Sequence, residues 1–363
     1  MLPPLTAIPP EVASVSDYEK LAAERVEPGA WAYLQGGAAD EITAERNLES
    51  FRAYDIVPRL FRDLTNAHTR LKLLEREYEH PVFIAPTAFH RLFHPEGEVA
   101  TALAATALES PFTLSTLAST SLEDVASQPE KNPAGLWFQL YLQPEREDTL
   151  SLVRRAEKAG YEALVLTADA PLSGLRNREQ RARFLRPAHI QPVNLAGLPS
   201  QPPSELIFGS PLLENAPTWP DLAWLAEKTS LPILLKGVLH PDDARAALDH
   251  GAAGLIVSNH GGRVLDTVPA TLSVLSDIAK ALDSRAPLLF DGGIRRGSDI
   301  FKALCLGADA VMIGRPILHG LAAAGALGVA HVLKLLRTEL EMTMALAGCP
   351  DLASAHPDFL RPF

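Results

Sequence analysis

Eight short apolar runs recur along this chain of 363 residues, and each run ends at glycine, proline or a polar residue. The runs are continuously apolar rather than alternating, as expected for strands with both faces buried in a parallel sheet. Apart from one longer interval, successive runs begin roughly 20 to 35 residues apart, which is the usual length of a strand–helix repeat. The predicted strands are Pro81–Pro86, Phe112–Thr116, Trp137–Tyr141, Ala163–Asp169, Pro232–Val238, Gly254–His260, Pro287–Gly293 and Ala310–Pro316.

Eight strand–helix units in one chain predict a (β/α)8 TIM barrel. An open doubly wound sheet is the weaker alternative, because no Gly-x-Gly-x-x-Gly motif follows an early strand. Helix starts are expected at Ser119–Leu122 and at Pro241, whereas Thr218–Asp221 lacks the glutamate of a capping box and is not expected to form one. The amphipathic stretches that predict helices between the strands include Glu145–Ala159, Pro241–His250 and Gly297–Leu306.

Residues 1–80, before the first strand, predict a helical leader with helices at Ser16–Glu24, Pro28–Gln35 and Ile42–Phe51. No linker-like stretch follows it, so we expect residues 1–363 to form one domain, in which residues 1–80 pack on a barrel of residues 81–350. The longer interval follows the fourth strand, between Asp169 and Pro232, and is rich in Pro, Asn, Ser and Gln. A loop of this length is usually a lid, a binding loop or a mobile insertion.

The composition argues against several classes of protein. Hydrophobic residues make up 47% and charged residues 21% of the chain, which is too apolar for a disordered protein. The formal net charge is −11 and no dense Lys/Arg run is present, so nucleic-acid binding is not expected. Cys305 and Cys349 cannot build a disulfide framework and lack metal-ligand spacing, so we expect a cytoplasmic protein without a metal site. The N-terminus has no secretory pattern, so no secretion is expected. The apolar stretch Gly320–Leu333 is too short to span a bilayer and predicts a buried helix, so we expect no membrane association.

Polar side chains occur where the predicted strands end. In a barrel of this type the carboxyl ends of the strands form one rim, and polar residues on that rim carry the chemistry. A single residue of this kind would more often belong to a turn, but every strand here supplies at least one. They are Thr87, Ser115, Gln139, Tyr141, Thr167, Asp169, Lys236, Ser258, His260, Asp291 and Arg315.

Two glycine motifs, Asp291-Gly292-Gly293 and Gly314-Arg315-Pro316, follow the last two strands. Such barrels commonly hold a phosphate at that place, because glycines let backbone N–H groups approach an anion. Arg295 and Arg315 could each bind phosphate oxygens with two guanidinium nitrogens. The alternative is tight turn geometry with surface arginine–carboxylate pairs, but two motifs in adjacent loops favour a phosphate-bearing ligand.

Lys236 ends an otherwise apolar strand, where a lysine is costly unless its charge meets an anion or its pKa falls. It could therefore contact an electron-rich cofactor atom or act as a Schiff-base nucleophile. A lysine that extends to the solvent at the rim is the structural alternative.

The segment Ser258-Asn-His-Gly-Gly-Arg263 is the most informative in the chain. His260 is a candidate general base, and Arg263 can bind a carboxylate with two guanidinium nitrogens. Asp169, at the end of the fourth strand, could orient the imidazole and stabilise its protonated form. Arg176 opens the long loop and offers a second cationic contact. A lone histidine is more often structural, but glycines and an arginine flank this one.

These residues resemble those of the FMN-dependent L-2-hydroxy acid oxidases and dehydrogenases. That family includes glycolate oxidase, lactate oxidase, mandelate dehydrogenase and the flavin domain of flavocytochrome b2. The resemblance covers the chain from about Tyr18 to about Cys349. The motifs that carry it are Ile84-Ala-Pro-Thr-Ala88, His94-Pro-Glu-Gly-Glu98, Phe138-Gln-Leu-Tyr141, Leu235-Lys-Gly237, Ser258-Asn-His-Gly-Gly-Arg263, Asp291-Gly-Gly-Ile-Arg-Arg-Gly297 and Ile313-Gly-Arg-Pro316.

The resemblance implies that FMN lies across the mouth of the barrel. Lys236 would lie by flavin N1 and the C2 carbonyl and stabilise negative charge on the reduced ring. The implied cofactor contacts are Pro86, Thr87, Ala88, Ser115, Gln139, Tyr141, Thr167, Lys236 and Ser258, together with Asp291, Gly292, Gly293, Arg295, Gly314 and Arg315 around the phosphate.

The resemblance also implies that Tyr33, Tyr141, Arg176 and Arg263 bind the carboxylate and hydroxyl of the substrate. His260 would remove a proton, and Asp169 would stabilise its protonated form. The proton would come either from the hydroxyl, with hydride transfer to flavin N5, or from the α-carbon through a carbanion. The sequence does not choose between these two orders.

Departures from the family pattern narrow the expected reaction. Leu117 stands where glycolate oxidases carry a tryptophan over the substrate pocket, which favours lactate or a larger 2-hydroxy acid. Ala88, and the lack of a membrane-anchoring segment in Leu185–Pro217, favour a soluble oxidase that reduces O2 to H2O2; the resemblance suggests a homotetramer. The alternatives are a dehydrogenase with another electron acceptor, a Schiff-base aldolase or lyase using Lys236, and a binding barrel without turnover.

Overall fold

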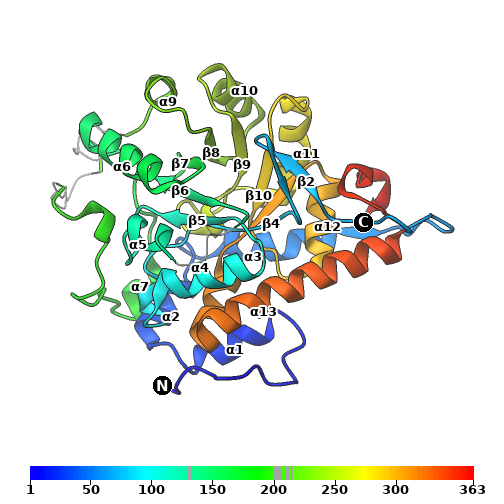
Figure 1. Cartoon of the computed structure of the whole chain (residues 1–363), viewed down its shortest axis with the longest axis horizontal. Helices are drawn as coiled ribbons and strands as arrows, with labels where there is room; N and C mark the ends of the chain where they lie inside the picture. Colours follow the sequence, from blue (N-terminus) through cyan, green and yellow to red (C-terminus); the bar gives the residue numbers. More distant parts are fainter. Residues whose placement is uncertain (129–132, 199–206, 209–212, 214–215) are drawn as a thin grey trace.

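Each of the eight predicted runs forms a strand, and the eight parallel strands close into the predicted barrel. This computed structural model describes the chain except residues 129–132, 199–206, 209–212 and 214–215. The strands follow the order β10-β11-β4-β5-β6-β7-β8-β9 around the barrel. Figure 1 shows helices surrounding these strands. They are β4 (Val82–Ile84), β5 (Phe112–Ser115), β6 (Leu136–Leu140), β7 (Ala163–Thr167), β8 (Ile233–Val238), β9 (Gly254–Val257), β10 (Leu288–Asp291) and β11 (Ala310–Ile313).

Both faces of these strands are buried, which explains their continuous apolar character. Inward-facing side chains such as Phe83, Trp137 and Val165 fill the barrel. An antiparallel hairpin of β2 (Leu71–Leu73) and β3 (Arg76–Tyr78) packs on this cluster. Arg76 of the hairpin pairs with Glu162, directly before β7, so the hairpin covers the end of the barrel where the strands begin. The other end, where the strands finish, is therefore the one that can form a cavity.

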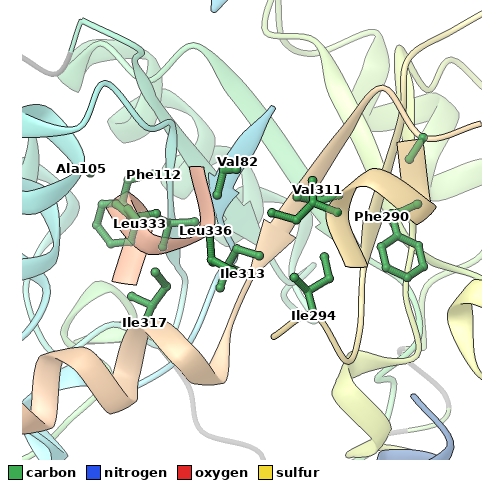
Figure 2. Packing of buried hydrophobic residues seen from close by; sticks show 14 of the residues in the cluster. Val82, Ala105, Phe112, Phe290, Ile294, Val311, Ile313, Ile317, Leu333 and Leu336 are labelled. Carbon is green, nitrogen blue, oxygen red and sulfur yellow. The ribbon is translucent and has the colours of Figure 1, made fainter. Parts of the chain in front are cut away.

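Outward-facing side chains of the strands pack against the surrounding helices. Figure 2 shows Val82 of β4 and Ile313 of β11 next to Leu333 and Leu336 of α13 (Arg315–Ala347). The other helices are α1 (Asp17–Ala23), α2 (Pro28–Gln35), α3 (Ile42–Glu49), α4 (Gly97–Ala107), α5 (Leu122–Ala126), α6 (Arg146–Ala159), α7 (Asn177–Arg181), α9 (Trp219–Ala226), α10 (Pro241–Asp249), α11 (Thr271–Leu282) and α12 (Gly297–Cys305).

The expectation that Thr218–Asp221 would not form a capping box is wrong. The backbone N–H and the hydroxyl of Thr218 both donate to the Asp221 carboxylate, at 3.0 and 2.6 Å, at the start of α9. An aspartate at this position reaches back to the first N–H as the usual glutamate does. The other two expected helix starts are confirmed, because Pro241 begins α10 and the Ser121 hydroxyl accepts from an N–H of α5.

The helix α13 has 33 residues and contains the predicted buried stretch Gly320–Leu333. It bends at Ala324 and Gly325, where Gly325 has a left-handed φ of 55° and a β-carbon would press against the His94 ring. Its length and composition would suit a membrane span, but 78% of its most apolar window is buried inside the fold. Because α13 packs against α1, α4 and α12 (Figure 1), it belongs to the core of the fold.

The leader helices α1, α2 and α3 are present, and the third continues into a 3-10 turn at Ser50–Ala53. The helix α1 packs on α13, whereas α3 packs on the turn that follows β9. After the leader, β1 (Tyr54–Ile56) pairs with β12 (Leu360–Pro362) near the C-terminus. The predicted long loop after β7 contains α7 and a 3-10 turn at Val193–Leu195, and its residues 199–206, 209–212 and 214–215 lie outside the described part of the chain.

Candidate active site

A cavity of about 650 Å³ opens where the barrel strands finish. Cofactor pockets in proteins occupy roughly 300 to 1,000 Å³, so this volume can hold a ligand of cofactor size. All of the site residues predicted from the sequence line it except Asp169 and Ser258, which are hydrogen-bonded to the lining residues His260 and Lys236. Those that line it are Tyr33, Pro86, Thr87, Ala88, Ser115, Leu117, Gln139, Tyr141, Thr167, Arg176, Lys236, His260, Arg263, Asp291, Gly292, Gly293, Arg295, Gly314 and Arg315.

His260 and Asp169 form a hydrogen-bonded pair at one side of the cavity. The Nδ1 atom of His260 lies 2.9 Å from Oδ1 of Asp169, and both side chains are largely buried. Burial opposes ionisation of Asp169, but the neighbouring His260 and Lys236 outweigh it and lower the pKa of the carboxyl. The aspartate is therefore a carboxylate that holds one ring nitrogen, which leaves Nε2 of the imidazole for a ligand.

A pair of asparagines fixes the backbone beside His260. The side chains of Asn47, in α3, and Asn259 exchange two hydrogen bonds of 2.8 Å each. Asn259 also accepts from the N–H of Gly262 at 3.1 Å, which closes the turn around His260. Asn47 is not predicted from the sequence, because a leader residue carries no local sign that it will pair with a residue 212 positions away.

Lys236 is buried and held in its charged form. Its Nζ donates to Oγ of Ser258 at 2.7 Å and lies 3.1 Å from Oδ2 of Asp291. Burial alone would lower the pKa of Lys236, but the carboxylates of Asp291 and Asp169 outweigh it and raise that pKa. A Schiff-base lysine needs a neutral amine, so this environment favours a role as a fixed positive charge.

Polar side chains from three adjacent strands form a hydrogen-bonded row. The hydroxyl of Ser115 donates to Oε1 of Gln139, and Nε2 of Gln139 donates to the hydroxyl of Thr167, both at 3.1 Å. The row crosses β5, β6 and β7 because their carboxyl ends meet at the same rim. It gives the cavity a polar wall of fixed orientation.

The glycine motifs lie together at the other side of the cavity. Gly292 and Gly293 have left-handed φ values of 113° and 81°, and a β-carbon on Gly293 would overlap the Asn47 carbonyl. Arg295 lines the cavity next to them, and burial lowers its pKa. The guanidinium of Arg315 also lines the cavity and donates to the backbone carbonyls of three residues. These are Leu34, Gly36 and Gly261.

Two further guanidinium groups converge at the mouth of the cavity. Arg263 donates to the backbone carbonyl of Tyr33 at 2.7 Å, and its guanidinium carbon lies 5.0 Å from the centre of the Tyr33 ring. Burial and the like charge of Arg263 lower the pKa of Arg176 to about 10, so Arg176 is still protonated at neutral pH. Its Nη1 is buried without a hydrogen-bond partner among the described residues. Both arginines lie beside Glu179, a lining residue that the sequence analysis missed.

The half-buried side chains of Tyr33 and Tyr141 complete this part of the cavity. Burial raises the pKa of Tyr33, and burial together with the Asp169 carboxylate raises the pKa of Tyr141. Both hydroxyls are therefore neutral and can donate a hydrogen bond.

The barrel, the pair of His260 and Asp169, and the glycine motifs match a known family. A family model described as FMN-dependent dehydrogenase matches residues 22–362. The chain belongs to the FMN-dependent dehydrogenase family. It is 48% identical to an L-lactate oxidase of Alicycliphilus denitrificans over 99% of each chain, and 43% identical to a glycolate oxidase of Spinacia oleracea over 94% of each chain. Its fold matches a crystal structure of mandelate oxidase with (S)-2-phenylpropionate at a TM-score of 0.87, with 38% identity over 97% of this chain and 98% of that one.

Members of the FMN-dependent dehydrogenase family use FMN, and the cavity of this chain fits that cofactor. Gly292 and Gly293 line the cavity without side chains, and Arg295 adds a cation, so this side suits a phosphate. The row of Ser115, Gln139 and Thr167 and the charged Lys236 offer fixed polar partners to a flavin ring. The predicted resemblance and the predicted cofactor are thereby confirmed.

Proposed function

We propose that this FMN-dependent 2-hydroxy acid oxidase converts L-lactate, or an L-2-hydroxy acid with a larger side chain, to the 2-keto acid while O2 is reduced to H2O2. The observation that carries the proposal is that a base, His260, and two guanidinium groups, Arg176 and Arg263, line the same cavity. A 2-hydroxy acid needs this combination, because its carboxylate must be held while a proton leaves the carbinol group.

Each residue in this site has a proposed task. The guanidinium groups of Arg176 and Arg263 bind the substrate carboxylate, and the unpartnered Nη1 of Arg176 supplies a free donor for it. Tyr33 and Tyr141 donate hydrogen bonds to the carboxylate and the hydroxyl. His260 accepts a proton at Nε2, and the Asp169 carboxylate stabilises the imidazolium that forms.

FMN, when bound, supplies the two-electron acceptor that takes up the remaining hydrogen and passes the electrons to O2. Lys236 would hold a positive charge against the ring, and Arg295 with Gly292 and Gly293 would hold the phosphate. The substrate loses two protons and two electrons, and O2 gains them to give one H2O2 for each 2-keto acid formed.

The proposed preference for lactate rests on the size of the residue at position 117. Leu117 lines the cavity together with the apolar side chains of Phe89 and Val264. These side chains leave an apolar surface for a methyl or larger substituent on the substrate. The similarity to L-lactate oxidases of Alicycliphilus denitrificans and Roseobacter sp., at 48% and 46% identity, supports the same substrate class.

An anaerobic titration followed in the visible spectrum tests the proposed function. L-lactate, L-mandelate and glycolate are added separately to the FMN-loaded enzyme under nitrogen, and bleaching of the flavin band reports oxidation. We expect bleaching at lower concentrations of L-lactate than of glycolate. A Leu117→Trp variant should shift this preference at least about tenfold toward glycolate, since one or two methylene groups in a pocket discriminate by about that factor.

Admission of air after the titration distinguishes the two electron acceptors. An oxidase regains the flavin band and forms one peroxide per keto acid. A reduced flavin that stays bleached in air, and is reoxidised only by an added quinone or dye, would instead show the alternative dehydrogenase.

A further inference from the structure

Glu179 places a carboxylate between the two guanidinium groups of the cavity. Its Oε1 atom lies 3.5 Å from Nη2 of Arg263 and 3.7 Å from Nε of Arg176. The three side chains are between 17% and 21% exposed, so water screens their charges only partly. Burial raises the pKa of Glu179, whereas both arginines oppose that shift.

The charges at this position leave room for one further anion. Arg176 and Arg263 carry two positive charges and Glu179 carries one negative charge. The next cation along α7, Arg178, is paired with Glu41 and adds nothing to the balance. The side chains of Arg176, Arg263 and Glu179 alone therefore have a net charge of one, which a single ligand carboxylate neutralises. Arg315, a further half-buried cation that acts on both arginines, donates to backbone carbonyls.

A second ligand carboxylate would meet an unfavourable field. Glu179 already neutralises one of the two guanidinium charges, which leaves none for a second ligand carboxylate. Repulsion from the fixed Glu179 carboxylate also grows in proportion to the charge of the ligand. Removal of the Glu179 charge should consequently raise the binding affinity for a dianion more than that for a monoanion of the same shape.

We propose that Glu179 makes the site selective for hydroxy acids with one carboxylate and excludes dicarboxylic ones. This role rests on the proposed function, since it assumes that the ligand carboxylate binds at Arg176 and Arg263. Glu179 acts as a specificity residue through the electrostatic field, and it does not take part in proton transfer.

Oxamate and oxalate are suitable probes, because they have nearly the same shape and differ by one negative charge. Calorimetric titration of the FMN-loaded enzyme gives the dissociation constant of each anion without turnover. In Glu179→Gln the affinity for oxalate should rise roughly tenfold relative to that for oxamate, as expected for one charge removed at a distance of several ångströms in a partly buried site. Turnover of L-malate relative to L-lactate should rise in the same variant.

Two control variants separate the effect of charge from a loss of structure. Glu179→Asp keeps the charge and should keep the wild-type ratio of the two affinities. Glu123→Gln removes the same charge from a surface pair with Arg155, outside the cavity, and should leave the ratio unchanged. If Glu179 has only a structural role, Glu179→Gln should weaken the binding of both anions equally. An unchanged ratio of the two affinities would therefore overturn the proposal. Failure of L-lactate to bleach wild-type flavin would instead contradict the proposed function, whatever the ratio.

Discussion

His260 is held in a conformation that few histidines adopt. Its backbone φ of 57° lies in the left-handed region, which costs about 1 kcal/mol or more for a residue with a β-carbon. The conformation persists because neighbouring groups determine it: the His260 N–H donates to Oγ of Ser258 at 3.1 Å, and the ring is bonded to Asp169. Such strain at a cavity wall is characteristic of functional residues, and here it occurs at a residue that lines the cavity.

Loss of the His260 side chain should remove the base while leaving the rest of the site in place. In His260→Ala we expect flavin reduction by L-lactate to slow by at least about 10²-fold, the contribution of a positioned general base. Anaerobic stopped-flow absorbance measures this rate directly, and retention of the flavin spectrum serves as the control for an intact site. A reduction rate close to that of the wild type would exclude His260 from the proton transfer.

Residues of the site differ in how well the sequence alone predicts them. Polar residues at strand ends were predictable, because parallel strands of a closed barrel must bring their carboxyl ends to one rim. Asn47 and Glu179 were not predictable, since each depends on where a leader or a loop packs against that rim. The side-chain direction of Arg315 was also beyond the sequence, because it is set by backbone carbonyls from separate segments.

At the scale of single elements, His80 joins β4 to the end of α4. Its Nε2 lies 2.9 Å from the Leu108 carbonyl and its Nδ1 accepts from the Val82 N–H at 3.2 Å, so the ring is neutral with a proton on Nε2. Burial, assisted by the nearby Arg337, lowers the pKa of His80 to about 4.

This lowered pKa predicts acid destabilisation with a definite sign. Below about pH 6.5, the usual pKa of histidine, the unfolded chain binds a proton at His80 that the folded chain refuses until about pH 4. Between pH 7 and pH 5 the His80 contribution to the free energy of unfolding should fall by about 2 kcal/mol. Denaturant unfolding of the wild type and of His80→Gln at both pH values measures this loss, which should be smaller in the variant. An equal loss of stability in the two proteins would contradict the lowered pKa of His80.

The bend in α13 involves two glycines, Gly325 at the bend and Gly328 after it. The periodicity of the sequence did not predict this bend. The apolar pattern predicted a buried helix, and it is present, but the pattern does not show that the backbone leaves helical geometry at Ala324 and Gly325. The bend brings Gly328 against the Gly320 carbonyl so closely that a β-carbon on Gly328 would overlap it.

Gly328→Ala should therefore destabilise the fold, although alanine favours helices. We expect the overlap with the Gly320 backbone to cost roughly 1 to 3 kcal/mol of unfolding free energy, the usual range for overpacking in a core. Thermal unfolding of the variant measures this cost. Ala326→Gly serves as a comparison, because its main effect is the loss of about 1 kcal/mol of helix propensity. An alanine variant as stable as the wild type would show that the bend can open without cost.

Across the whole molecule, the two ends of the barrel differ: one is filled and covered, and the other holds the cavity. The hairpin of β2 and β3 covers the end where the strands begin, and apolar side chains fill the interior beneath it. The opposite end keeps a cavity of about 650 Å³ that is lined by charged and polar groups, which buried space tolerates only when ligands or partners satisfy them. Two of these groups, Nη1 of Arg176 and Oδ1 of Asp291, are buried without a hydrogen-bond partner among the described residues.

Removal of FMN should for this reason lower the stability of the whole fold. A ligand present at 100 times its dissociation constant stabilises the folded state by about 2.7 kcal/mol, so the melting temperature of the apoprotein should lie roughly 3 to 4 °C below that of the loaded enzyme. Differential scanning calorimetry before and after removal of FMN with acid and salt measures the shift. Added FMN should restore the melting temperature of the loaded enzyme. Riboflavin lacks the phosphate expected at Gly292, Gly293 and Arg295, so it should restore much less; full recovery with riboflavin would show that this side of the cavity contributes nothing to cofactor binding.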